Sequence, residues 1–374
     1  MKFNIDKISI NYLLSQNKIV QLALHSIMLL FFKIVRTINK YLAADGNGIL
    51  IISLHRLGDT VFTIPAIKEL QRKYPDNLKI VCYPESVSIY NLEFKNIDIQ
   101  SIRKDDFYFD GRILKSEIKK NVKNLKPSMV VDITGSMKSA SIIFNLRVKE
   151  IIGTNGIQFR TLYDLFAEFR QSPKLIDIYL DVVKLKVEIS GEKDFIRKNT
   201  QPNKNGKVLI HPFAGWKEKE WNLKKFIQLA ERIRESCPVS FVVQKNQLSR
   251  DIICEIENLN IEVIQTSSVD DLVECIQDST LFIGNDSGPV NVANYLNKPT
   301  TTIFSATNSD YTSTGCEHHK IIQNKVSCSA RDNEKFCAIG GMFYKCSGVQ
   351  CMNFLEVESV VPTINNLVQT GFRH

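Results

Sequence analysis

The feature that most constrains the fold of this chain is an alternation of short apolar runs with helical stretches, which occurs twice. In the first half the run GILIISL, residues 48–54, precedes a stretch in which Val61, Ile64 and Ile67 share one helical face until Pro75. Further apolar runs follow at LKIVCY, MVVDIT and EIIGT. Short strands that alternate with helices are typical of a parallel sheet covered by helices.

A polar stretch around 188–207 interrupts this pattern, which then restarts with KVLIHP, VSFVVQ, IEVIQT, LFIGND and TTTIFS. At 374 residues the chain exceeds the size that one hydrophobic core usually supports. We therefore predict an α/β protein with two Rossmann-like, doubly wound domains that face a central cleft. The expected parts are an amino-terminal extension (1–45), a first domain (46–190), a linker (191–206) and a second domain with a cysteine-containing loop and a C-terminal helix (207–374).

The amino-terminal extension contains the apolar run 19–35, which is interrupted by polar residues. On a helix, those residues and Arg36 fall within an arc of about 140°, so the segment is expected to form an amphipathic helix. Lys2, Lys7, Lys18 and Lys40 flank or end it, which favours an anionic lipid surface as a partner. The alternatives are that its apolar face packs on the first domain or on a second subunit.

The charge balance of 48 basic against 40 acidic residues, a net +8, suits an anionic partner such as a nucleotide diphosphate, an acidic glycan or a lipid surface. Basic residues are spread along the chain without the clusters typical of nucleic-acid binding, so no nucleic-acid partner is expected. Nine cysteines without a signal-peptide cleavage site predict a cytoplasmic protein, peripheral on the inner face of the inner membrane if the helix binds lipid.

The first candidate site residues are in LHRLGDT, residues 54–60, where a strand ends and a helix begins. Gly58 permits a tight turn, and Asp59 then lies near a helix amino terminus, whose dipole keeps a carboxylate ionised. The alternative is that Asp59 only caps the helix.

The second candidate is HPFAGWKEKEW, residues 211–221, which begins at the end of another predicted strand. Ala214 and Gly215 are small enough for close approach by a phosphate, and Lys217 and Lys219 supply positive charge. A loop that carries lysines can also be no more than solvated surface.

The third candidate is IGNDSGPVNVANYLNKP, residues 283–299, again a strand, a turn and a helix. Ser287, Gly288 and Pro289 form a helix amino terminus with unpaired N–H groups, which suits a diphosphate, and Asp286 is expected to orient the bound group. The alternative is a simple capped turn.

These segments resemble glycosyltransferase family 9, the heptosyltransferases. GILIISLHRLGDTVFTIPAIKEL is similar to the opening of the family, VVDITGSMKSA to its second block, HPFAGWKEKEWNLKKF to a third, and IGNDSGPVNVANYLNKPTTTIFSATN to its donor-site signature. The resemblance runs, with gaps, from about residue 48 to the carboxyl terminus.

The resemblance implies a GT-B fold and an inverting transfer of a heptose-type sugar from ADP-heptose or a related donor to a lipopolysaccharide core or another surface glycan. It implies Asp59 as the general base, Lys219 as a donor-binding lysine, and Asp286, Ser287 and Gly288 as donor-loop residues. No cofactor is required if the lysine and the helix-end N–H groups stabilise the departing diphosphate. The alternatives are a protein acceptor, as in autotransporter heptosylation, and a non-catalytic GT-B scaffold.

Two positions depart from the family pattern. Asn291 stands where the family usually has histidine, and it can form hydrogen bonds but carries no positive charge. Where an acidic residue is typical for ribose binding, this chain has Gln247, Ser249 and Arg250. Both departures bear on the donor that the protein accepts.

The last candidate site consists of four cysteines, Cys328, Cys337, Cys346 and Cys351, separated by eight, eight and four residues. The absence of a tight C-x-x-C pair is unlike a zinc ribbon. Within the resembled family, autotransporter heptosyltransferases carry an iron held by four cysteines, which implies a structural iron or zinc here. The alternative is a set of reduced or partly paired thiols.

Overall fold

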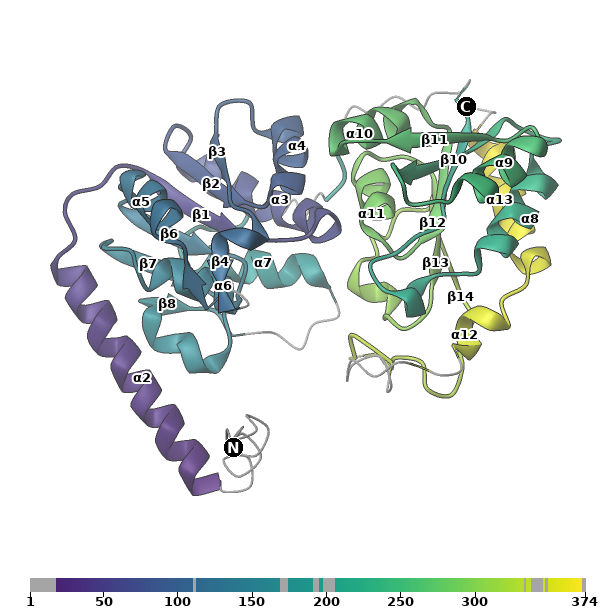
Figure 1. Ribbon diagram of the computed structural model, residues 1–374. Coiled ribbons are helices and arrows are strands. Elements are labelled where there is room, and N and C mark those ends of the chain that lie inside the picture. The colour runs from purple at the N-terminus through teal and green to yellow at the C-terminus, as the bar shows by residue number, and fades with distance from the viewer. Residues whose placement is uncertain are drawn as a thin grey trace, which may run out of the picture.

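Two parallel six-stranded sheets form the frame of the protein in the computed structural model (Figure 1). Residues described by the structure are 18–109, 112–168, 174–190, 195–197, 206–332, 334–337, 346 and 349–371. The predicted linker thus lies largely outside the described residues, as do Lys2 and Lys7.

The first sheet has the strand order β3-β2-β1-β6-β7-β8, and all its neighbours are parallel. Its central strands are fully buried, because apolar residues project to both helix-covered faces. The strands are β1 (Ile49–Ser53), β2 (Leu78–Cys82), β3 (Asp98–Ser101), β6 (Met129–Asp132), β7 (Glu150–Gly153) and β8 (Leu165–Phe166). The helices are α3 (Leu57–Lys73), α4 (Pro84–Glu93), α5 (Ser116–Asn124), α6 (Met137–Ile143) and α7 (Leu175–Lys184). A hairpin of β4 (Phe107–Tyr108) and β5 (Ile113–Leu114) stands beside them.

The second sheet repeats this topology with the order β11-β10-β9-β12-β13-β14. Its strands are β9 (Val208–His211), β10 (Val239–Gln244), β11 (Glu262–Thr266), β12 (Leu281–Asn285), β13 (Thr300–Phe304) and β14 (His319–Gln323). Its helices are α8 (Leu223–Ile233), α9 (Arg250–Asn258), α10 (Val269–Asp278), α11 (Gly288–Tyr295), α12 (Gln350–Asn353) and α13 (Val357–Gly371).

Each sheet reverses its strand order at one point, between β1 and β6 in the first and between β9 and β12 in the second. Ligands of doubly wound sheets bind outside the carboxyl ends of the strands at such a point. The fold therefore places the segments after β1, β9 and β12 where a ligand is expected.

The two sheets share one hydrophobic core, since buried residues of α3 and α11 belong to the same cluster. Phe195, which follows the first domain, stacks on Phe62 at a centroid distance of 4.5 Å and packs edge-on against Tyr295 at 5.9 Å. Arg197 pairs with Glu93 at 3.0 Å and donates its backbone N–H to the Tyr295 carbonyl at 2.8 Å. This part of the predicted linker therefore holds the two domains together.

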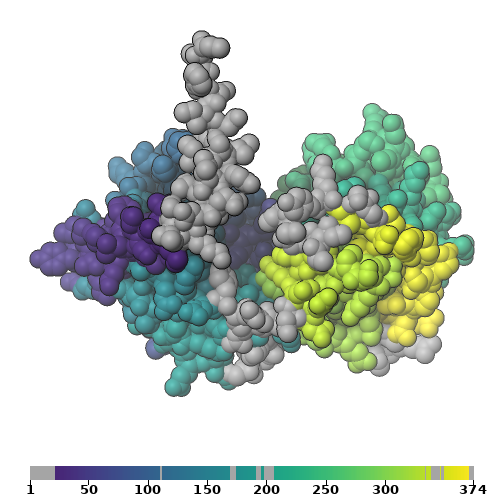
Figure 2. Space-filling view, turned by 90° about the horizontal axis from the view of Figure 1, so that it is seen from below, coloured from purple at the N-terminus to yellow at the C-terminus, as the bar shows by residue number. Residues whose placement is uncertain are grey.

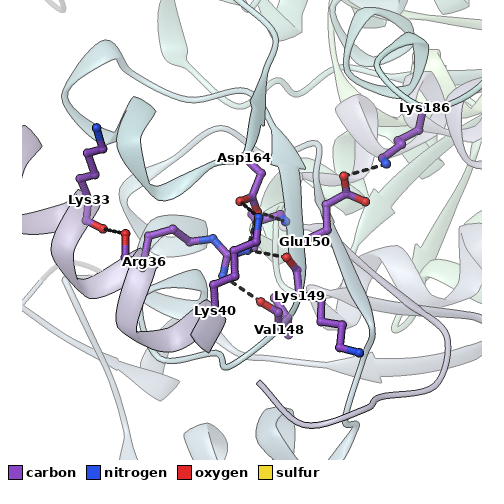
Figure 3. Close-up of polar contacts among 10 residues, drawn as sticks. Lys33, Arg36, Lys40, Val148, Lys149, Glu150, Asp164 and Lys186 are labelled. Carbon is purple, nitrogen blue, oxygen red and sulfur yellow. Dashed lines mark hydrogen bonds and ion pairs between the residues drawn. The ribbon is translucent and has the colours of Figure 1, made fainter. Parts of the chain in front are cut away.

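The amino-terminal helix is α2 (Lys18–Tyr41), which runs along the outside of the first domain, away from the second (Figures 1 and 2). Its Arg36 side chain is buried and donates to the carbonyls of Val148 at 2.8 Å and Lys149 at 3.1 Å, and also to the Asp164 carboxylate (Figure 3). One of the alternatives expected for this helix was packing on the first domain, and one face of α2 does pack there.

The predicted fold class is confirmed, including the amino-terminal helix and the GT-B arrangement. The predicted central strands and the helices between them are present. The edge strands β3, β8 and β14 and the hairpin were not predicted, because they lack a run of buried residues and all but β14 are also short. The exact domain boundaries stay predictions.

Candidate active site in the interdomain cleft

A cavity of about 520 Å³ lies between the two domains, and all nine predicted donor-site and catalytic residues line it. Gly58 and Asp59 come from the start of α3, and Lys219 from the loop after β9 with Ala214 and Gly215. The remaining four, Asp286, Ser287, Gly288 and Asn291, surround the start of α11. The topology therefore brings together segments that are more than 200 residues apart; the role of each residue stays a prediction.

The amino termini of α3 and α11 meet at two glycines. A Cβ atom on Gly58 would lie 2.9 Å from the Gly288 Cα atom, and one on Gly288 would lie 3.1 Å from the Gly58 nitrogen. Because each helix start carries partial positive charge and free N–H groups, their convergence makes an anion-binding region.

Asp59 is half-buried in the first turn of α3, and Arg56 rather than Asp59 occupies the N-cap position. The capping alternative for Asp59 is thus wrong. Its charge acts to raise the pKa values of His55, Tyr179, Tyr311 and Lys335, so the carboxylate stands amid these four side chains.

Asp286 holds Lys219 in position. The Lys219 ammonium donates to an Asp286 carboxylate oxygen at 2.5 Å, and the Thr307 hydroxyl donates to the same oxygen at 2.5 Å. Lys219 also lies over the Trp216 ring, 4.9 Å from its centroid. The Asp286 carboxylate therefore orients this lysine, whereas the sequence predicted that it orients the ligand.

Asn285, at the end of β12, fixes the loop that carries Lys219. Its side-chain oxygen accepts the Trp221 backbone N–H at 2.9 Å, and its amide donates to the Pro212 carbonyl at 2.7 Å. Asn222 then caps α8 by accepting the Lys224 N–H at 2.9 Å. Lys217, in contrast, is exposed and pairs with Glu220 at 2.8 Å, so the other predicted basic residue of this loop does not line the cleft.

Ser287 is the N-cap residue of α11, yet its hydroxyl makes no capping hydrogen bond. Its oxygen is buried and has no hydrogen-bond partner among the described residues. A buried hydroxyl without a partner is costly, so this atom is available to a ligand in the cleft.

Among the described residues three cations face this cleft, and the sequence did not single out two of them, Arg56 and Lys335. Arg56 reaches across the cleft to Gly215, whose added Cβ would lie 3.5 Å from an Arg56 guanidinium nitrogen. Lys335 lies over the Tyr311 ring at 4.2 Å. Burial lowers the pKa of Lys335 and Lys219 adds to this effect, while Asp59 and Asp286 oppose it. Arg56 lies inside the motif LHRLGDT, whereas Lys335 is brought in by tertiary structure alone.

Of the residues at the predicted ribose position, Gln247 lines the cleft, whereas Ser249 caps α9. The Gln247 side-chain oxygen accepts the Gln244 backbone N–H at 3.0 Å. Its amide N–H₂ group is the part of this side chain that remains to meet a ligand.

The four predicted cysteines border a second cavity beside the cleft, with Trp216 lining both. Burial raises the pKa of the Cys351 thiol, and Cys337, Cys328 and Cys346 raise it further, which places the four sulfur atoms within electrostatic reach of one another. Four thiolates in one cavity fit a tetrahedral iron or zinc ion.

A separate group was missed by the sequence analysis: one ligand atom each of Cys316, His318 and His319 lies within 4.8 Å of the others. Its signal, C-x-H-H, is short and ends at His319, the first residue of β14. His319 also pairs with the Thr314 hydroxyl at 2.6 Å, and His318 with Asn297 at 2.9 Å.

Two doubly wound domains whose strand-order switch points face a shared cleft define the GT-B fold. A sequence profile of glycosyltransferase family 9 (heptosyltransferase) matches residues 116–340, and the chain belongs to this family of enzymes. It is 25% identical over 306 residues to the lipopolysaccharide heptosyltransferase 1 of Campylobacter coli, covering 77% of this chain and 82% of that relative.

Solved structures agree on the fold. The E. coli ADP-heptose lps heptosyltransferase II superposes with a TM-score of 0.64 at 14% identity, covering 86% of this chain and 99% of the other. The iron-containing dodecameric glycosyltransferase TibC from enterotoxigenic E. coli H10407 superposes with a TM-score of 0.54 at 11% identity, covering 87% and 77% of the two chains.

Proposed function

We propose that this protein is an inverting heptosyltransferase that takes its sugar from ADP-heptose and transfers it to a lipopolysaccharide core or another surface glycan. The observation that carries the proposal is the convergence of Asp59, Lys219 and the unpartnered Ser287 hydroxyl on one interdomain cavity. The related E. coli enzyme is named for ADP-heptose, which supports this donor.

In the proposed mechanism the acceptor hydroxyl lies beside Asp59, which takes its proton as the oxygen attacks the anomeric carbon. The bond from that carbon to the diphosphate breaks on the opposite side, so the configuration inverts. Lys219, Ser287 and the N–H groups at the start of α11 stabilise the negative charge that develops on the leaving diphosphate.

Asn291, which replaces the histidine usual in the family, is compatible with this mechanism although it carries no charge. Asn291 is buried at the end of the first turn of α11, beside Gly58. Arg56 and Lys335 add positive charge to the cleft, so we propose that they compensate for the histidine that other members have.

The test is Asp59→Asn, with Asp310→Asn as the matched control because Asp310 is outside the cavity lining. We expect Asp59→Asn to lower the transfer rate by about 10²- to 10⁴-fold, while ADP still raises the melting temperature as in the wild type. Transfer that survives the change undiminished would show that Asp59 is no base.

The donor and the class of protein are tested by a panel of nucleotides. ADP is expected to stabilise the protein more than UDP or GDP does. If no nucleotide stabilises the protein and no donor is turned over, the proposed activity is wrong and the protein is a non-catalytic GT-B scaffold. If the protein transfers sugar to a protein acceptor but to no glycan, it is an autotransporter heptosyltransferase.

We also propose that Cys328, Cys337, Cys346 and Cys351 hold a structural iron, as the iron-containing TibC fold relative leads us to expect. Elemental analysis of protein purified without a metal-affinity column should find about one iron or zinc per chain. Cys351→Ser should lose the metal; a metal-free wild-type protein overturns the proposal.

A further inference from the structure

Helix α2 presents three different faces. One packs on the first domain through Phe32, Arg36 and Asn39. A second is polar and contains Ser26 and Lys33. The third, which we call the apolar face, covers an arc of about 120° and carries side chains that are each at least 48% exposed: Leu24, Ile27, Leu30, Phe31, Ile34 and Ile38.

The packed face fixes the carboxyl-terminal half of the helix on the surface of the domain. The Thr161 hydroxyl donates to the Leu29 carbonyl at 2.8 Å, and the Asn39 amide donates to the Phe144 carbonyl at 3.1 Å. Asp164 accepts from both Arg36 and Lys40, and these hydrogen bonds hold its pKa low against the opposing effect of burial (Figure 3). α2 is long and apolar enough to cross a membrane, but its contacts from Leu29 to Lys40 hold that part of the helix flat against the first domain.

The apolar surface continues from α2 onto the domain. Phe31 borders a groove whose other wall includes Ile113 of the β4–β5 hairpin and Met137 at the start of α6. Ile113 and Met137 are 51% and 42% exposed. Arg112 borders the same groove. Side chains from three elements thus form one exposed apolar surface with a cation at its rim.

The charged side chains of α2 itself are all basic. No Asp or Glu occurs in α2, whose Lys33 points away from the Asp164 cluster (Figure 3). An exposed apolar strip with basic flanks complements an anionic bilayer, whose headgroups attract the cations while its acyl chains take the apolar side chains.

We propose that the apolar face of α2, with Ile113 and Met137, docks on the surface of an anionic lipid bilayer, with the helix axis in the membrane plane. Lys33 and Arg112 then lie at the level of the headgroups. This docking orients the first domain on the membrane. If the chain is the transferase proposed above, on which this last step rests, its acceptor is carried by a lipid.

The first experiment measures co-sedimentation of the full chain with vesicles of phosphatidylglycerol and phosphatidylcholine in equal parts, and with phosphatidylcholine alone. We expect binding to the anionic vesicles that weakens with salt, because exposed charges are screened. The double variant Leu30→Glu/Ile34→Glu should lower the partition coefficient by about tenfold or more, since it removes two inserted apolar side chains. Ser26→Glu, on the polar face, adds a negative charge to the same helix and should cause a smaller loss.

A second variant, Phe31→Trp, places a fluorescent reporter on the apolar face without a charge change. Its emission should shift to the blue with anionic vesicles. The proposal is overturned if the wild type binds no vesicles, if Leu30→Glu/Ile34→Glu binds as well as the wild type, or if the reporter does not shift. A dimer that dissociates in the double variant, without vesicle binding, shows instead that a second copy covers this face.

Transfer assays separate this proposal from the enzymatic one. The double variant should lose transfer to a lipid-borne acceptor in vesicles but keep transfer to the same glycan freed of lipid. If the wild type and the double variant transfer sugar equally well to the acceptor in vesicles, the proposal of a lipid-borne acceptor is wrong. Failure of every acceptor while vesicle binding persists refutes the proposed function and leaves the docking intact.

Discussion

Two buried histidines lie near the carboxyl ends of β1 and β9, His55 two residues after β1 and His211 as the last residue of β9. His55 donates from Nε2 to the Ile133 carbonyl at 3.1 Å, and His211 donates from Nδ1 to the Phe213 carbonyl at 3.1 Å. Burial lowers the pKa of both, for His211 to about 4. Each is therefore neutral in the folded protein at neutral pH and donates a hydrogen bond to the backbone. The acceptor of His211, Phe213, lines the cleft.

His211 should make the folding stability depend on pH. Its pKa falls from 6.5 in the unfolded chain to about 4 in the folded protein, so protonation favours unfolding. Its contribution is present above about pH 6.5 and is lost progressively as the pH falls towards 4, by about 3 kcal/mol in total.

The measurement is the free energy of unfolding of wild type and His211→Asn between pH 7 and pH 4. We expect the difference between the two proteins to change with pH as described. Burial raises the pKa of Asp132 to about 6, which has the opposite sign, but Asp132 is present in both proteins and cancels. A difference that does not change with pH would contradict the assignment.

At this scale the sequence predicts which residues line the cleft but not all of their partners. The motifs contain Asp286 and Lys219, and their types indicate a polar site. That Asp286 pairs with Lys219 depends on a contact between residues 67 positions apart. Such a contact depends on how two loops pack, which no local pattern encodes.

At the scale of elements, the decisive contact is between the starts of α3 and α11. A Cβ atom at position 58 would lie 2.9 Å from the Gly288 Cα atom and 3.0 Å from the Asn291 amide nitrogen. A backbone atom is the nearest, so a rotamer change cannot relieve that contact and the helices must separate.

We predict that Gly58→Ala lowers the free energy of unfolding by about 1–3 kcal/mol and weakens stabilisation by ADP. Gly215→Ala is the control for stability, because its Cβ would meet only a flexible Arg56 guanidinium nitrogen, at 3.5 Å. Thermal and denaturant unfolding measure both effects. Equal stability of the two variants would show that the helices can separate without loss.

Central strands and the helices between them were predictable because burial on both faces leaves continuous apolar runs. α2 was predictable for another reason, because its polar residues fall on one side of a helix. Its three faces were not, because the sequence does not show that Arg36 turns inward to Asp164 while Lys33 stays outside.

At the scale of the whole molecule, the domains are joined more tightly than a polar linker indicates. Phe195 is one aromatic residue in a polar stretch, and the sequence gives no reason to bury it. In the structure it is 7% exposed between Phe62 and Tyr295, in a core that extends across both sheets. The sequence predicted two similar domains. It did not predict the contacts that fix one domain against the other.

The facing starts of α3 and α11 also bear on turnover. In a transferase that uses a nucleotide sugar, the released nucleoside diphosphate is more negatively charged than the donor, because its terminal phosphate is freed. Two positive helix ends and three cations then attract the spent nucleotide at least as strongly as the substrate. We therefore expect strong product inhibition, and we expect release of the nucleotide, rather than sugar transfer, to be the rate-limiting step.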